Sequence, residues 1–211
     1  MLLTSEPSIC NSYGTKDASH GAFQKYAVVP KVSVAELSSS ISFAKGAVLP
    51  LGISTAAAGL YQKGYLALPL PTNDSSIEPL GRAVLIWGGS SSVGSCAIQL
   101  AAASGAEVYT TASKSNFDYC RKLGASEVFD YHDDDVEDQI VAALRHKTVA
   151  GAYHAVGGDG AVQSCAKIVD RTNGKAIVVT VKGAPDEGIP KSVRIKMSMS
   201  SAAIRFIVIT D

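Results

Sequence analysis

Short β-rich runs alternate with helix-length segments between residues 82 and 181, and this alternation restricts the possible folds more than any other feature. The first run, residues 83–87, is continuously apolar, which is typical of a strand covered on both faces of a parallel sheet. The alternation predicts an α/β fold with a doubly wound parallel sheet and right-handed crossovers. The expected strands are 83–87, 107–112, 127–130, 151–156 and 176–181, with helices near 92–104, 116–123, 134–145 and 160–169.

The sequence before residue 82 is less regular. Its clearest β signal is Phe23–Pro30, where aromatic and β-branched residues end at a proline. Residues 42–64 are Ala-rich, with Pro50 placed near a helix start, and predict two helical pieces. Residues 68–79 hold three prolines and a polar cluster, so we expect a loop there.

Composition excludes several classes of protein. The 19 basic and 19 acidic residues balance, whereas a nucleic-acid binder needs a basic excess. No apolar run approaches the roughly 18 to 20 residues that cross a bilayer, and the N-terminus does not resemble a signal peptide, so we expect a cytoplasmic protein without membrane partners. The irregular spacing of Cys10, Cys96, Cys120 and Cys165 predicts reduced thiols rather than disulfides or a zinc site.

The most informative strand end is the first, where residues 83–87 run directly into GGSSSVG at 88–94. A glycine-rich turn that enters a helix lets backbone N–H groups approach a pyrophosphate, and the helix N-terminus adds partial positive charge. The motif is not G-x-G-x-x-G, because Ser91 occupies the middle position. A tight turn with serine caps remains the alternative, but the βαβ context favours dinucleotide binding.

Two strings, VLIWGGSSSVGSCAIQLAAASGAEVYTTAS and KLGASEVFDY, resemble the cofactor domain of the medium-chain dehydrogenase/reductases. The similarity is to the zinc-independent, quinone oxidoreductase-like branch, and within it to fungal zinc-binding-dehydrogenase-like proteins and trans-acting enoyl reductases. It covers about residues 20–200. It implies a remnant of a GroES-like catalytic domain at 1–49 and a Rossmann cofactor domain at 50–188. Residues 189–211 would then be a tail with part of the segment that returns to the catalytic domain.

The resemblance also implies residue roles. The pattern A-x-x-G-x-x-G falls on Gly88, Ser91 and Gly94, and Ser91, Ser92 and Val93 would offer backbone and hydroxyl groups to the pyrophosphate. Thr55 matches a threonine beside the nicotinamide. The segments 155–157, with Val156, and 181–183 match backbone that lines the ribose and nicotinamide, although ordinary loop packing explains them equally well.

Cofactor choice depends on the end of the second strand, where an NAD site places an acidic residue. Glu107 follows Gly88 at nearly the sequence distance expected for that acidic residue. It is, however, the first residue of the strand, so it lies at the opposite end of the strands from the cofactor. Ser113, Lys114 and Asn116 follow the strand end, and the resemblance adds Tyr131. These residues predict NADP(H), preferred over NAD(H) about tenfold or more. Phe117 replaces a lysine common in the family, and a solvated turn with an incidental lysine is the alternative.

No metal is expected, because the resemblance is to the metal-free branch. His132 heads an acidic stretch that could suggest a carboxylate metal site, but a solvated helix N-terminus is the simpler interpretation. His154 could lie near substrate, yet a hydrogen-bonded core histidine is the commoner case. Hydride transfer needs alignment and water exclusion rather than an acid/base pair, so the catalytic residues stay unknown.

Three functions follow from these observations. The favoured one is an NADPH-dependent oxidoreductase that transfers a hydride to an activated alkene or quinone, free or carrier-bound. The alternatives are a non-catalytic NADPH-binding module and a partner-binding protein. Relatives extend further at both ends, so we expect a truncated member with an open cleft and weak turnover. We also expect the sixth strand to be missing, which leaves the fifth as a sheet edge that the tail, residues 203–210, covers or uses for homo-oligomers.

Overall fold

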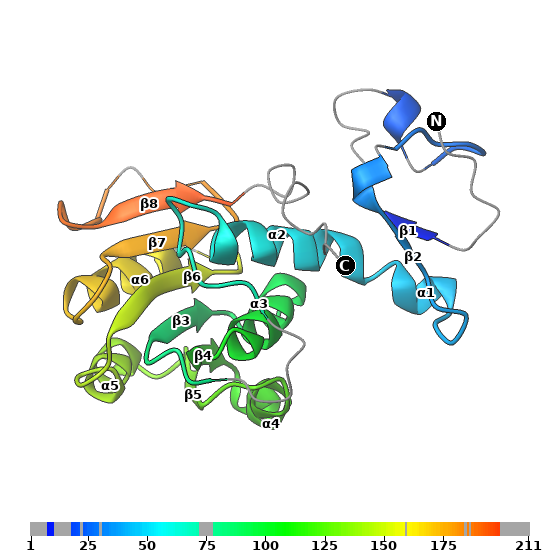
Figure 1. Cartoon of the computed structure of the whole chain (residues 1–211). Coiled ribbons are helices and arrows are strands. Elements are labelled where there is room, and N and C mark those ends of the chain that lie inside the picture. The colour runs from blue at the N-terminus through cyan, green and yellow to red at the C-terminus, as the bar shows by residue number, and fades with distance from the viewer. Residues whose placement is uncertain are drawn as a thin grey trace.

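A six-stranded parallel sheet in the order β5-β4-β3-β6-β7-β8 forms the centre of the protein (Figure 1). The computed structural model describes residues 8–10, 18–21, 23–29, 31–71, 78–158, 160–183, 185 and 187–198. The strands of the sheet are β3 (Ala83–Trp87), β4 (Glu107–Ala112), β5 (Glu127–Asp130), β6 (Val149–His154), β7 (Ile177–Thr180) and β8 (Arg194–Met197). The helices are α1 (Phe43–Gly46), α2 (Leu49–Tyr61), α3 (Ser92–Ala103), α4 (Phe117–Lys122), α5 (Val136–Ala143) and α6 (Ala161–Asp170), with a 3₁₀ turn at Lys114–Asn116.

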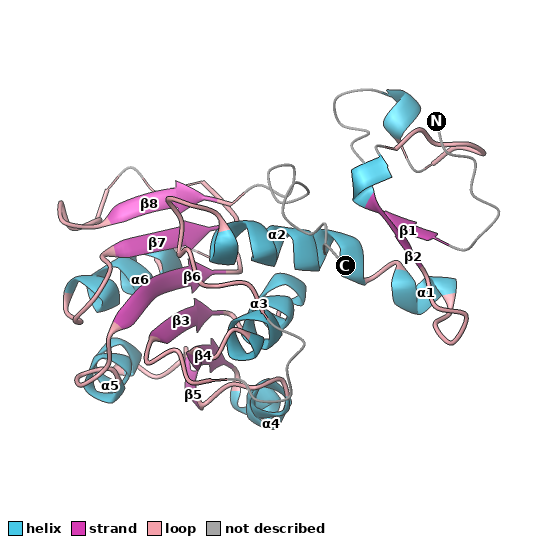
Figure 2. Cartoon of the chain, viewed as in Figure 1, coloured by secondary structure: helices cyan, strands magenta, loops and turns pink. Residues whose placement is uncertain are grey.

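The doubly wound α/β fold predicted from the alternation is confirmed. Strands β3, β4 and β5 have the expected bounds, and β6 and β7 differ from them by one or two residues at each end. Successive residues of β3 point to opposite faces, which creates two cores. Val84 and Ile86 pack with α2 and α3, whereas Leu85 and Trp87 pack with α5 and α6. Figure 2 shows these helices on either side of the sheet.

The expected absence of a sixth strand is wrong. Strand β8 pairs in parallel with β7, from Ile177 opposite Arg194 to Thr180 opposite Met197. The sequence RIKM does not indicate a strand, because it has only four residues and two of them are charged. Its side chains are mostly exposed, since β8 is the outermost strand on its side of the sheet. Strand β7, which was expected to be a free edge, is therefore paired with β8. The role expected for residues 203–210 falls outside the described residues.

The N-terminal segment also differs from expectation. Residues 23–29 form no strand, and the side chain of Phe23 is fully exposed, because no described strand lies beside it. A small antiparallel pair instead joins β1 (Ser8–Cys10) to β2 (Val34–Glu36), flanked by 3₁₀ turns at Ala18–His20 and Lys31–Ser33. This part lies beyond the N-terminal end of α2 in Figure 1.

The two helical pieces predicted for residues 42–64 are present as α1 and α2. Together they form a stretch, Phe43–Tyr61, that by length and composition alone is apolar enough to cross a membrane, which the sequence analysis did not anticipate. Half of that stretch is buried in the fold, where α2 packs along α3. Buried core helices of globular proteins meet the same criterion, so this stretch is weak evidence for a membrane span.

Candidate functional site

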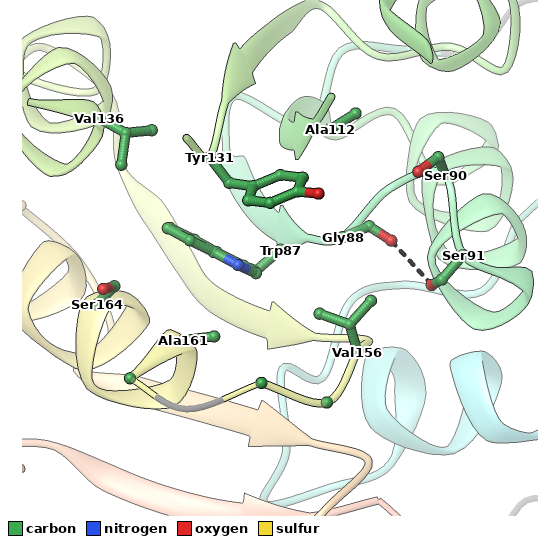
Figure 3. A pocket seen from close by; sticks show the side chains of 13 residues that line it. Trp87, Gly88, Ser90, Ser91, Ala112, Tyr131, Val136, Val156, Ala161 and Ser164 are labelled. Carbon is green, nitrogen blue, oxygen red and sulfur yellow. Dashed lines mark hydrogen bonds between the residues drawn. The ribbon is translucent and has the colours of Figure 1, made fainter. Parts of the chain in front are cut away.

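A pocket of about 550 Å³ lies at the carboxyl end of the sheet, where ligands of doubly wound folds bind (Figure 3). Its wall combines the glycine turn after β3, the ends of β4 and β5, and the first turns of α5 and α6. The lining residues are Trp87, Gly88, Ser90, Ser91, Ala112, Tyr131, Val136, Val156, Gly157, Gly158, Gly160, Ala161 and Ser164.

The glycine turn requires glycine at three positions. A Cβ on Gly89 would collide with the side chain of Thr110. Gly88 has a φ of +86°, and a Cβ on it would collide with the side chain of Val156. A Cβ on Gly94 would collide with the carbonyl oxygen of Gly88. The turn therefore brings the start of α3 directly against the end of β3.

Ser91 holds this turn in place. Its Oγ accepts a 3.0 Å hydrogen bond from the backbone N–H of Gly94, and it lies 2.8 Å from the carbonyl oxygen of Gly88 and 3.2 Å from that of Ala155. The hydroxyl is thus committed to capping α3 and tying it to the end of β6. The N–H groups of Ser92 and Val93, in the first turn of α3, have no partner inside the helix. Open N–H groups at a helix N-terminus are suited to binding an anion.

The ends of β4 and β5 close the other side of the pocket. Ala112 and Tyr131 line it, whereas Ser113, Lys114 and Asn116 lie just beyond it. Ser113 Oγ accepts a 2.9 Å hydrogen bond from the amide nitrogen of Asn116. The Lys114 ammonium lies 3.7 Å from Asp130 Oδ2 and 3.7 Å from Asp133 Oδ1, an arrangement that the sequence analysis did not foresee. Glu107 lies at the opposite end of the strands, as expected for the first residue of β4. Its carboxylate forms an ion pair there with Lys147.

Of the predicted cofactor residues, the pocket brings together Gly88, Ser91, Tyr131 and Val156. Gly94, Ser92 and Val93 stand behind it in the turn and the first turn of α3. Thr55 is buried in α2, where its hydroxyl donates to the carbonyl of Leu51. Its own carbonyl accepts hydrogen bonds of 2.8 Å from Tyr153 and from Ser198.

Sequence reasoning missed Trp87, Val136 and Ser164. Trp87 is the last residue of β3 and the chain's single tryptophan, and it lines the cavity together with Tyr131 (Figure 3). A signal was available, because alternation along β3 puts Trp87 on the same face as Leu85, toward α5 and α6.

The two histidines that were weighed as candidates have different environments. His132 Nδ1 lies 2.8 Å from Asp130 Oδ1. The pKa of the Asp130 carboxyl group is lowered, mainly by the hydrogen bond that it accepts from the backbone N–H of His132. His154 is buried, with Nδ1 3.0 Å from Thr180 Oγ1, so its prediction as a hydrogen-bonded core histidine is confirmed. Burial, aided by the charge of Lys182, lowers the pKa of His154 to about 4, which keeps the ring neutral at physiological pH.

Within the described part of the chain, no three His, Cys, Asp or Glu side chains gather in a way that could hold a metal ion. This residue set does not fit a zinc site. The pocket does fit a dinucleotide, because it combines a tight glycine turn, an open helix N-terminus and apolar walls.

Residues 92–208 match the family model of zinc-binding dehydrogenases. The chain is 47% identical over 175 residues to the dehydrogenase pigH of Monascus ruber, covering 83% of this chain and 47% of that protein. It is 42% identical to the trans-enoyl reductase himH of Aspergillus japonicus, covering 88% of this chain and 52% of that protein. The structure of Escherichia coli K-12 YhdH with bound NADPH has a TM-score of 0.59 at 20% identity, covering 94% of this chain and 59% of that one. The chain spans about half the length of the curated relatives it matches.

Proposed function

The chain belongs to the zinc-binding dehydrogenase family of the medium-chain dehydrogenase/reductases, and from this premise we propose that it is an NADPH-dependent oxidoreductase. Its reaction would be hydride transfer to an activated alkene or a quinone. The observation that carries the proposal is the N-terminus of α3, which follows the glycine turn beside the pocket of about 550 Å³ at the strand ends.

The residues of this chain would hold the cofactor in three ways. The N–H groups of Ser92 and Val93 would bind the pyrophosphate, as helix N-termini do. Trp87, Val136 and Ala161 offer apolar surface for the adenine. Thr55 would lie beside the nicotinamide, as the family resemblance implies, and its carbonyl is fixed by Tyr153 and Ser198.

Bound nicotinamide supplies the hydride, and this chemistry asks the protein for alignment and exclusion of water. The pocket contains no acid/base pair among its described lining residues, which is compatible with such a reaction. No step is assigned to a metal.

Two observations support the proposed substrate and the proposed cofactor. The printed name of himH, trans-enoyl reductase, supports an activated alkene as substrate. The end of β4 is neutral or basic through Ala112, Ser113 and Lys114, which supports a phosphorylated ribose over a free diol. The partner-binding alternative depended on the tail, which lies outside the described residues.

The first test is binding. Because Trp87 is the single tryptophan and lines the pocket, titration with NADPH should quench its fluorescence by energy transfer to the reduced nicotinamide. Trp87→Phe should abolish this signal while calorimetry still detects binding. Unchanged fluorescence together with no heat of binding would refute cofactor binding.

The second test is turnover. NADPH absorbance should fall when an enone or a quinone is added, and only in the presence of one of these acceptors. Binding without acceptor-dependent loss of absorbance would refute the reductase and leave the non-catalytic NADPH-binding module.

A further inference from the structure

A chain of two hydrogen bonds links α4 to the glycine turn after β3. The hydroxyl of Tyr119, on α4, donates to Ser95 Oγ at 3.1 Å. Ser95 Oγ in turn donates to the carbonyl oxygen of Gly89 at 3.1 Å. Ser95 is buried in α3, and these bonds use its single donor and one of its acceptor positions. We call this pair of bonds the Tyr119–Ser95 relay.

The relay fixes the orientation of one peptide unit in the turn. The described backbone contains no cis peptide bond, so the carbonyl of Gly89 and the N–H of Ser90 point in opposite directions. Because Ser95 holds the carbonyl, the N–H of Ser90 points away from Ser95. Ser90 lines the pocket of about 550 Å³ (Figure 3). The relay therefore sets how this residue is presented to the cavity.

The rest of the turn is held by other bonds. The N–H of Gly88 donates to Thr111 Oγ1 at 3.0 Å, and the N–H of Gly89 donates to the carbonyl of Thr111 at 2.9 Å. The N–H of Ser91 donates to the carbonyl of Gly88 at 3.1 Å. A flip of the Gly89–Ser90 peptide would leave these three bonds in place and break the bond to Ser95. Glycine tolerates such a flip because it lacks a Cβ, so the relay is what opposes it.

We propose that Ser95 and Tyr119 are positioning residues for the cofactor, which hold the Gly89–Ser90 peptide with the Ser90 N–H toward the pyrophosphate. This N–H would be a further donor beside those of the α3 N-terminus. The inference rests on the proposed function and deepens it. Ser95 and Tyr119 would act through the turn without touching the cofactor.

The relay also connects two parts of the expected cofactor position. Helix α4 follows directly on residues 113–116, which we expect beside the ribose 2′-phosphate. Tyr119 therefore ties that segment to the turn that would hold the pyrophosphate. Bonds that share a hydroxyl strengthen one another, so loss of the tyrosine donor should weaken the bond from Ser95 to Gly89.

Two variants shorten the relay by one step each. Ser95→Ala removes the donor that holds the Gly89 carbonyl, and alanine is compatible with the helix. We expect the NADPH affinity measured by calorimetry to fall about fivefold, the scale of one hydrogen bond. Tyr119→Phe removes only the outer bond, so the loss should be about twofold.

Ser104 provides a matched control at the other end of α3. It is 8% exposed, as is Ser95. Its Oγ donates to the carbonyl of Leu100 at 3.0 Å and lies 3.2 Å from the hydroxyl of Tyr61. Ser104→Ala therefore breaks an equivalent set of bonds away from the glycine turn. It should lower thermal stability about as much as Ser95→Ala does and leave the NADPH affinity unchanged.

The backbone N–H resonance of Ser90 gives a readout that a loss of stability does not reproduce. In protein labelled with ¹⁵N-serine, it is assigned as the serine signal that disappears in Ser90→Ala. Addition of NADP⁺ should shift this resonance in the parent and in Ser104→Ala. The shift should be clearly smaller in Ser95→Ala, because the peptide is no longer held.

Equal NADPH affinities in Ser95→Ala and Ser104→Ala would overturn the positioning role, as would a Ser90 resonance that NADP⁺ leaves unmoved in the parent. If Ser95→Ala does not fold, the comparison of Tyr119→Phe with Tyr61→Phe decides by the same two measurements. A parent that does not bind NADPH would reject the proposed function and the positioning role together. A parent that binds, with equal affinities in the paired variants, would reject the positioning role alone.

Discussion

The α-carbon of Gly94 faces the carbonyl oxygen of Gly88 so closely that no side chain fits between them. Gly94→Ala should therefore push α3 away from β3 and cost about 1–3 kcal/mol of unfolding free energy. It should also weaken NADPH binding tenfold or more, about 1.4 kcal/mol, because the N–H groups of Ser92 and Val93 move with the helix.

Gly183→Ala is the matched control, since a Cβ there would meet nothing within 4 Å. Urea unfolding should place this variant within about 0.5 kcal/mol of the parent. Equal stabilities for the two variants would contradict the close approach.

Most of the fold follows from periodicity. Strands β3, β4 and β5 are buried apolar runs bounded by turn residues, so their bounds are readable in the sequence. Strand β8 is not readable, because its register is set by hydrogen bonds with β7 rather than by its own apolar residues. Residues 23–29 show the opposite case, in which β propensity without a neighbouring strand yields no strand.

The Tyr153 hydroxyl ties β6 to α2 through the carbonyl of Thr55. Tyr153→Phe should lower the unfolding free energy by about 1 kcal/mol, because the ring stays packed and Ser198 still donates to the same carbonyl. Tyr26→Phe, at an exposed ring, should have no measurable effect. A loss above about 3 kcal/mol in Tyr153→Phe would mean that the hydroxyl supports more than this single bond.

Acid should destabilise the protein through His154. Its folded pKa of about 4 lies below its ordinary value of 6.5, so the unfolded state binds the proton more readily. Stability should be full above pH 6.5 and should fall as pH drops from about 6.5 to 4, by at most about 3 kcal/mol.

His154→Gln should remove this slope, which urea unfolding at several pH values would measure. The lowered pKa of Asp130 acts in a different window, because its contribution is present above its ordinary value of 3.8 and is lost only below it. If the parent and the variant lose stability in parallel between pH 6.5 and 4, proton binding by His154 is not the cause.

The candidate site was only partly predictable. The glycine turn and the end of β5 are local features, so Gly88, Ser91, Tyr131 and Val156 could be assigned to one cavity from the strand order. Val136 and Ser164 come from the first turns of α5 and α6, and their approach depends on how those helices pack over β3.

Cofactor choice should depend on the charges around Lys114. The Lys114 ammonium lies 3.7 Å from both Asp130 and Asp133, so a ribose 2′-phosphate would compete with two carboxylates for it. Asp130 is fixed by the backbone N–H and the ring of His132, whereas Asp133 is more exposed. Asp133→Asn should therefore leave Lys114 with one neighbouring carboxylate instead of two and strengthen NADPH binding severalfold, with little change for NADH.

Ser113→Asp and Lys114→Gln should act in the opposite direction. The first places a carboxylate at the end of β4, where it would accept hydrogen bonds from a ribose diol and repel a 2′-phosphate. The second removes the positive charge. We expect the parent to prefer NADPH over NADH by about tenfold or more, or 1.4 kcal/mol, and Ser113→Asp to erase this preference. Calorimetric titration of both cofactors against the parent and the three variants measures each ratio. Equal parent affinities, or variants that shift both cofactors alike, would show that the end of β4 does not contact the 2′ position.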